Sequence, residues 1–152
     1  FQGDYAQGYG MTELAATVCT DIPSAGRVGT VGIPLPLVNI KIVAKDDEEL
    51  SCGEEGEICI SSPSMMLGYY NNQEETDRII RIDDNGDEII AVCGERWIYT
   101  GDIGSVDDDG FLHLKGRIKR IYITRDTKQN VCKLFPSEIE NKLKETTDVV
   151  EC

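Results

Sequence analysis

The sequence predicts a mainly β fold with some α structure: an antiparallel, distorted β-barrel subdomain, followed by the start of a small α+β domain. Two observations predict the barrel-like part. Apolar and polar residues alternate over stretches of strand length, and acidic, glycine-containing turns join these stretches in pairs. The third observation is one clear helical pattern near the C-terminus. With 152 residues, 40% of them hydrophobic, the chain is long enough for one domain or slightly more.

The strands follow one another along the chain, because regularly spaced hairpins favour an antiparallel sheet or a barrel. Residues 38–42 alternate clearly, as in a half-buried strand. Asp83–Asp87 and Asp107–Gly110 are expected hairpin turns. We expect strands at residues 38–42, 57–60, 78–82, 88–93, 103–106, 111–114 and 118–124, and helices near 11–17 and 73–80.

The acidic turns also suggest calcium, because an EF-hand loop places its ligands at set offsets from a central glycine. Around Gly110 the first ligand position is Ser105 and the closing position is Gly116. Around Gly86 the first position is Arg81. Neither turn carries the pattern, so both are interpreted as ordinary turns.

The helical pattern begins at Pro136, which suits a first helical turn, and Glu138 and Glu140 suit its positive end. Ile139 and Leu143 form a short apolar stripe. A stripe of this size needs packing partners. We therefore expect the last 35 residues to begin a domain that this chain does not complete.

The net charge of −13 disfavours nucleic acid as a partner, because phosphate backbones are bound by clustered Lys and Arg. No apolar run approaches the ~20 residues of a membrane span, and no secretory leader is visible. Six basic residues do cluster, either on a solvated strand and loop or around a small anion such as a nucleotide: Lys115, Arg117, Lys119, Arg120, Arg125 and Lys128.

The six cysteines lack a CxxC pair, and the chain has one histidine. These spacings fit neither a zinc site nor a disulfide framework. We expect reduced, buried thiols and a cytoplasmic protein.

Residues 7–13, QGYGMTE, place Gly8 and Gly10 around Tyr9. Each glycine costs about 1 kcal/mol in a helix, so we expect a loop whose backbone closely approaches another group. Further motifs follow in order: GRVGTVGIPLP (26–36), GEICISSPSMMLGYYNN (56–72), YTGD (99–102), DDGFLHLKGRIK (108–119) and FPSEIE (135–140).

Together these motifs resemble the adenylate-forming enzymes, which include acyl- and aryl-CoA synthetases, peptide-synthetase adenylation domains and luciferases. The resemblance spans nearly the whole chain, with gaps near 83–96 and 125–132, and is strongest toward the acyl-CoA synthetase branch. It implies that Tyr9 stacks on adenine, as one flat face on another. Gly10 and Met11 would lie along the nucleotide, Thr12 would bind the α-phosphate, and Glu13 would bind Mg²⁺.

The resemblance further implies that Asp102 accepts both ribose hydroxyls, for which a carboxylate has two acceptor oxygens, and that Arg117 reaches the same ribose. Lys119 would be the hinge. The domains would then be residues 1–115, a hinge at 116–119, and the small domain from 120–152.

Each of these residues also has a purely structural interpretation. Tyr9 could cap the core and Glu13 could be solvated. Asp102 could be a helix cap or a turn residue, and Arg117 and Lys119 could be surface charges. The sole histidine, His113, is expected to be an ordinary strand residue. Tyr69 and Tyr70 are expected to pack or to line a rim.

The implied reaction joins a carboxylic acid to ATP, giving an acyl-adenylate and pyrophosphate, and then passes the acyl group to a thiol, either coenzyme A or a carrier-protein pantetheine. Catalytic roles fall to Thr12 and Glu13, with ATP/AMP and Mg²⁺ as cofactors. The alternative is a non-catalytic, β-rich nucleotide-binding or interaction module that retains the fold.

The sequence departs from the family in three places. The phosphate-cradling Ser/Thr/Gly-rich loop and the C-terminal catalytic lysine are both missing, so we expect a piece of a larger enzyme that is inactive alone. Residues 124–134 lack the glycine found in relatives, where this loop helps to build the thiol tunnel. This difference weakens the inference that coenzyme A is the acceptor.

Overall fold

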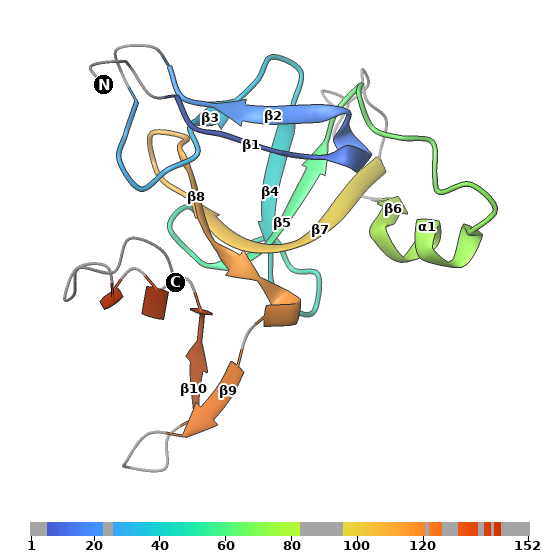
Figure 1. The fold of residues 1–152 in the computed structure, drawn as a ribbon. Coiled ribbons are helices and arrows are strands. Elements are labelled where there is room, and N and C mark those ends of the chain that lie inside the picture. The colour runs from blue at the N-terminus through green and yellow to red at the C-terminus, as the bar shows by residue number, and fades with distance from the viewer. Residues whose placement is uncertain are drawn as a thin grey trace.

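The computed structural model confirms a mainly β, antiparallel chain (Figure 1). It describes residues 6–22, 26–82, 96–120, 122–125, 131–136, 139–140 and 142–143. Within these residues the strands form three distorted sheets, of three, five and two strands, and do not close into a single barrel. No described helix is long and apolar enough to cross a bilayer.

The three-stranded sheet begins the chain, with β1 (Gly8–Met11), β2 (Ala16–Thr20) and the short β3 (Ile33–Pro34). A single 3-10 turn, η1 (Thr12–Leu14), joins β1 to β2. The helix predicted near residues 11–17 is therefore wrong. Ala15 and Ala16 adopt positive φ angles of 56° and 112°, which turn the chain back into β2 after one helical turn.

The five-stranded sheet has the order β4-β5-β7-β6, with β8 also paired to β7. Its strands are β4 (Asn39–Val43), β5 (Gly56–Ser61), β6 (Ile80–Ile82), the long, curved β7 (Arg96–Val106) and β8 (Leu112–Arg117) (Figure 1). The predicted strands at 38–42 and 57–60 are confirmed, as is the hairpin at 103–114, in which Val106 pairs with Leu112.

The predicted helix near 73–80 is α1 (Gln73–Ile79). The Asn72 side chain caps it by accepting from the Glu75 N–H at 3.1 Å. The strand predicted at 78–82 is right only for its last three residues, because α1 continues to Ile79. The predicted turn at 83–87 and the strand at 88–93 lie outside the described residues.

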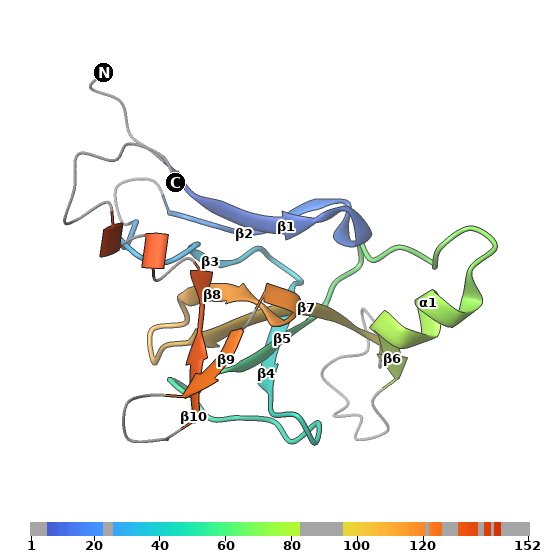
Figure 2. The same ribbon diagram turned by 60° about the horizontal axis from the view of Figure 1, so that its bottom comes forward.

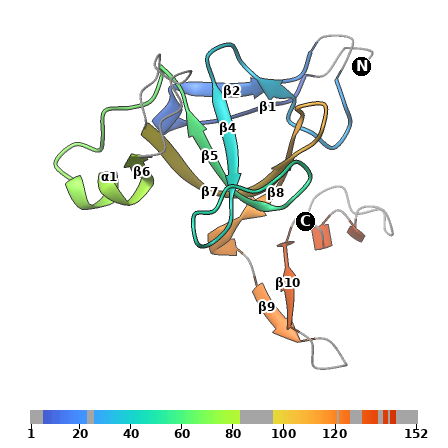
Figure 3. The same cartoon turned by 180° about the vertical axis from the view of Figure 1, so that it is seen from behind.

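The C-terminal part projects away from these sheets (Figures 1 and 3). A 3-10 turn, η3 (Ile118–Arg120), follows β8, and β9 (Tyr122–Arg125) pairs with β10 (Val131–Leu134). The strand predicted at 118–124 therefore starts later than expected, because its first three residues form η3. Of the segment 124–134, predicted as a loop, the described residues 124–125 and 131–134 belong to the two strands of this hairpin. Of the expected helix, Pro136, Ile139, Glu140, Lys142 and Leu143 are described, and all five are helical.

The main core lies between the β1–β2 hairpin and the five-stranded sheet; Figure 2 shows the hairpin as a layer above β7 and β8. Successive side chains of a strand point to opposite faces. In β5, Ile58 and Ile60 enter this core, while Cys59 packs with Val43 and Trp97 on the other face. Burial on both faces fixes the register of the sheet.

The thiol predictions are confirmed in part. Cys19 and Cys59 are buried and free, but Cys52 is free and exposed. Cys52 lies in the turn before β5, where no second layer covers it. The side chains of the other three cysteines lie outside the described residues.

Candidate functional site

The centre of the site is a contact between two residues 93 positions apart. The hydroxyl of Tyr9, on β1, donates to Oδ2 of Asp102, on β7, at 2.7 Å. Each residue is only 7% exposed. Burial is the main reason that the pKa of Tyr9 lies above its usual range. The two motifs QGYGMTE and YTGD therefore meet inside the molecule.

The second oxygen of Asp102 is also engaged. Nε of Arg117 lies 3.2 Å from Oδ1, and the β7–β8 register pairs these two residues directly. The Arg117 side chain is largely exposed, while the carboxylate is not. Each carboxylate oxygen has a further lone pair, so Asp102 can still accept bonds from a ligand.

A cavity of about 640 Å³ opens beside this pair; Arg117 lines it, whereas the buried Asp102 does not. Its lining includes most of the residues that the sequence singled out: Gly10, Met11, Thr12, Glu13, Arg117 and Lys119. Gly101, next to Asp102, also lines it. The structure thus gathers the end of β1, η1, the middle of β7 and residues 117–119 around one space.

Tyr9 lines a different cavity, of about 720 Å³, along the β1–β2 hairpin, while its side chain belongs to the main core. Gly10, Met11 and Thr12 line both cavities. The close backbone approach predicted for Gly10 is present inside the protein. A Cβ on Gly10 would lie 1.8 Å from the carbonyl oxygen of Ala16, at a bulge in the hairpin.

The segment of β7 next to Asp102 is held by Glu57, a residue that was not predicted as part of the site. The N–H of Gly101 donates to Oε1 of Glu57 at 2.9 Å, and Gly101 has a left-handed φ of 72°. The Asp102 N–H donates to Oγ1 of Thr100, which donates to the Ile58 carbonyl. Burial is the largest cause of the raised pKa of Glu57. Glu57 lies in the motif GEICISSPSMMLGYYNN (56–72), and this position was the available signal in the sequence.

Glu13 is held by a second missed residue. The Tyr69 hydroxyl donates to Oε1 of Glu13 at 2.5 Å. This bond is the first cause of the rise of the Tyr69 pKa to about 12. The prediction that Tyr69 packs or lines a rim omitted this contact. Tyr70 is 92% exposed.

Glu13 fits a magnesium role only together with a nucleotide. Among the described residues no cluster of three or more His, Cys, Asp or Glu side chains could enclose a metal ion. Mg²⁺ is commonly held by one or two carboxylates plus substrate phosphates and water. The single carboxylate of Glu13 on the cavity wall matches that arrangement.

Several cations surround the same cavity. Arg78 pairs with Glu75, and Arg81 binds Asp47 at 2.8 Å while its guanidinium lies 3.9 Å from the Tyr99 ring centroid. Of the predicted basic cluster, Arg117 and Lys119 line the cavity, whereas Lys115 pairs with Glu55.

His113 is a strand residue on β8, as expected. Its Nε2 lies 3.0 Å from Oδ2 of Asp107, and Arg27 binds the same carboxylate. These contacts tie the β7–β8 hairpin to the loop before β3, away from the residues that line the cavity.

The fold and the site define a mainly β unit with a cavity suited to a nucleotide. A family profile described as AMP-binding enzyme matches residues 1–70. A long-chain-fatty-acid–CoA ligase of Salmonella typhimurium is 33% identical over 146 residues, covering 95% of this chain and 23% of that protein. A probable 4-coumarate–CoA ligase of Dictyostelium discoideum is 43% identical over 117 residues, covering 76% of this chain and 19% of that protein.

Solved structures agree with these matches. O-succinylbenzoate coenzyme A synthetase from Bacillus subtilis, in complex with AMP, superposes with a TM-score of 0.75 at 29% identity, covering 96% of this chain and 27% of that one. This chain belongs to the adenylate-forming superfamily of AMP-binding enzymes. It spans about a quarter or less of the length of the curated relatives given above.

Proposed function

We propose that this chain is the nucleotide-binding part of an ATP-dependent carboxylate-activating ligase. The observation that carries the proposal is the Tyr9–Asp102–Arg117 contact, which lies next to a cavity lined by Arg117, Thr12 and Glu13. The matches to CoA ligases support the reaction class.

The proposed roles follow the chemistry of each side chain. Asp102 accepts the ribose hydroxyls, Arg117 keeps the carboxylate oriented, and Tyr9 stacks on adenine. Thr12 is exposed on η1 and donates to an α-phosphate oxygen. Lys119, in η3, is the hinge between residues 1–115 and 120–152.

In the first step, a carboxylate oxygen attacks the α-phosphorus of ATP, and the bond to the bridging oxygen breaks to release pyrophosphate. In the second step, a thiol sulfur attacks the acyl carbon, AMP leaves, and the thiol proton passes to solvent. Negative charge grows on the phosphoryl oxygens in the first step. Mg²⁺ bound at Glu13 would supply charge neutralisation there. The favoured thiol is coenzyme A, with a carrier-protein pantetheine as the other option.

The test is pyrophosphate exchange by the full-length protein that contains this chain, with a panel of carboxylic acids, together with AMP binding by calorimetry. Asp102→Ala should weaken AMP binding by about 2 kcal/mol, or roughly 30-fold in Kd, because hydrogen bonds to a charged acceptor are lost. Asp108→Ala is the matched control. Asp108 is exposed on the turn after β7 and, unlike Asp102, contacts neither Tyr9 nor Arg117.

If the protein binds AMP but shows no pyrophosphate exchange with any carboxylic acid, the alternative of a non-catalytic nucleotide-binding module is favoured. Unchanged AMP binding in Asp102→Ala would contradict the proposed nucleotide grip. The 152-residue chain alone is expected to show no exchange.

A further inference from the structure

The loop between β5 and α1 contacts the η1 turn at several points, and one of these contacts reaches the proposed magnesium ligand. The Tyr69 hydroxyl donates to Oε1 of Glu13 at 2.5 Å. Among the described residues, Oε2 of Glu13 has no hydrogen-bond partner. One carboxylate oxygen is therefore fixed by the protein, and the other is left for a ligand.

Tyr69 is itself held firmly. The Tyr69 N–H donates to Oγ1 of Thr76 at 2.9 Å. The Thr76 hydroxyl in turn donates to the Asn72 carbonyl at 2.8 Å. Thr76 is buried on α1. Gly68 packs against it so closely that a Cβ there would lie 2.9 Å from Thr76 Cγ2. Helix α1 therefore fixes the backbone from which Tyr69 reaches Glu13.

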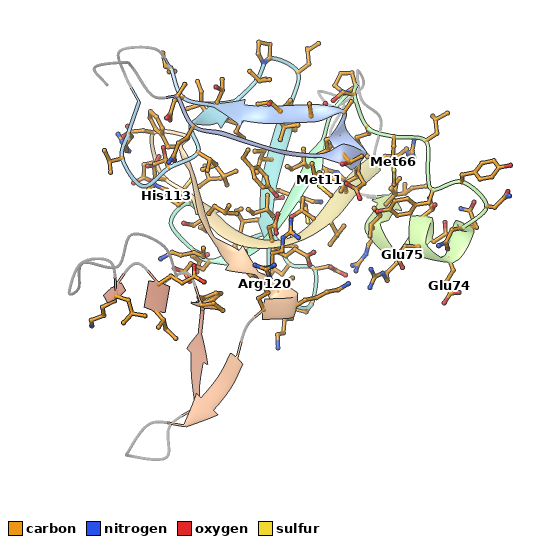
Figure 4. All side chains as sticks on the ribbon, viewed as in Figure 1. Met11, Met66, Glu74, Glu75, His113 and Arg120 are labelled. Atoms are coloured by element: carbon orange, nitrogen blue, oxygen red, sulfur yellow. The ribbon has the colours of Figure 1, made fainter. Side chains whose placement is uncertain are left out.

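The same loop also holds the backbone of η1. The Met66 N–H donates to the Glu13 carbonyl at 2.8 Å, and the Ser64 hydroxyl donates to the Leu14 carbonyl at 2.8 Å. In Figure 4, Met66 lies beside the turn that follows Met11. Backbone and side chain of Glu13 are thus held from one loop, which restricts the rotamers of a half-buried carboxylate on the cavity wall.

We propose that Tyr69 is a positioning residue for Glu13: its hydroxyl holds one carboxylate oxygen so that the other can bind the Mg²⁺ of ATP. The proposal rests on the proposed function, which assigns Glu13 to magnesium. Hydrogen-bond partners of metal-binding carboxylates orient them, and their loss typically costs 10–100-fold in metal affinity or activity.

The experiment uses calorimetry on the full-length protein that contains this chain. ATP binding is measured with saturating Mg²⁺ and in EDTA, and AMP binding is measured in EDTA. The variant is Tyr69→Phe, which removes one oxygen and keeps the ring. The control is Tyr70→Phe, since Tyr70 is the adjacent tyrosine and is 92% exposed.

We expect Tyr69→Phe to lose about tenfold of the Mg²⁺-dependent gain in ATP affinity, at the low end of that range because Tyr69 is partly exposed. AMP affinity in EDTA should stay within about twofold of wild type, and Tyr70→Phe should behave as wild type in all three measurements. In Tyr69→Phe, the Mg²⁺ concentration that gives half of the gain in ATP affinity should be higher than in wild type.

Two results would overturn the proposal. In one, Tyr69→Phe keeps the full Mg²⁺-dependent gain. In the other, AMP binding in EDTA falls as far as ATP binding does, which indicates a general structural role. If wild type binds neither nucleotide, the proposed function fails first and this inference fails with it, so the two failures are distinguishable.

Discussion

The buried bond between Tyr9 and Asp102 makes a measurable contribution to stability. Hydrogen bonds to charged groups contribute about 1.5–3 kcal/mol, and leaving one buried partner unsatisfied costs about 1–3 kcal/mol. Both residues are 7% exposed and their oxygens lie 2.7 Å apart, so water cannot easily replace either partner. We expect Tyr9→Phe and Asp102→Ala each to lower the free energy of unfolding by about 1–3 kcal/mol.

A double-mutant cycle separates this bond from the rest of each side chain. The double variant should lose about 2 kcal/mol less than the sum of the two single losses, because no buried partner is then left alone. Urea unfolding followed by Trp97 fluorescence measures each value. Trp97 is the only tryptophan and lies buried in β7, the strand that carries Asp102.

An unchanged slope of free energy against urea would show that the variants alter stability and not the extent of unfolding. Tyr70→Phe, at a 92% exposed position, is the control and should stay within about 0.5 kcal/mol of wild type. Additive losses, within about 0.5 kcal/mol, would refute the coupling between β1 and β7.

Two further predictions concern stability. Gly10→Ala should cost about 1–3 kcal/mol in urea unfolding, because the added Cβ would lie 1.8 Å from the Ala16 carbonyl oxygen and the hairpin must shift; a loss below about 0.5 kcal/mol would contradict this contact. The hydrogen bond from His113, followed by backbone N–H bonds, lowers the pKa of Asp107 from 3.8 to about 2. A folded-state pKa below the unfolded value gives stability that is present above about pH 4 and is lost as the pH falls toward 2. Asp107→Asn should therefore flatten the fall of the urea midpoint between pH 5 and 2, and an unchanged fall would exclude Asp107 as a cause.

Strands could be predicted where local alternation decided the structure. Residues 38–42 alternate in the sequence, and β4 spans Asn39–Val43. The helix expected near 11–17 failed because the backbone at Ala15 and Ala16 adopts positive φ angles, which alanine rarely takes and sequence does not signal. The strand expected from Ile118 started late for a similar reason, since three residues of η3 intervene.

The site was partly predictable because the short motifs contain its main residues. The residues that hold these in place could not be predicted. Tyr9 and Asp102 belong to quoted motifs, and the fold brings them into contact. Glu57 and Tyr69 act across 44 and 56 positions, through bonds to Gly101 and Glu13. No period or spacing reports such pairings, because they depend on how β5 pairs with β7 and on how the loop between β5 and α1 contacts η1.

Under the proposed function, this arrangement links nucleotide binding to folding. Asp102 is held by a side chain from β1 and another from β8, so the carboxylate has its observed geometry only when these strands are assembled on β7. A ligand that binds only the assembled state stabilises it, by about 2.7 kcal/mol at a concentration 100 times its Kd. The reverse must also hold. A substitution that distorts the β1–β2 hairpin, such as Gly10→Ala, should shift Tyr9 relative to Asp102 and so weaken AMP binding, even though Gly10 brings no side chain of its own to the ligand.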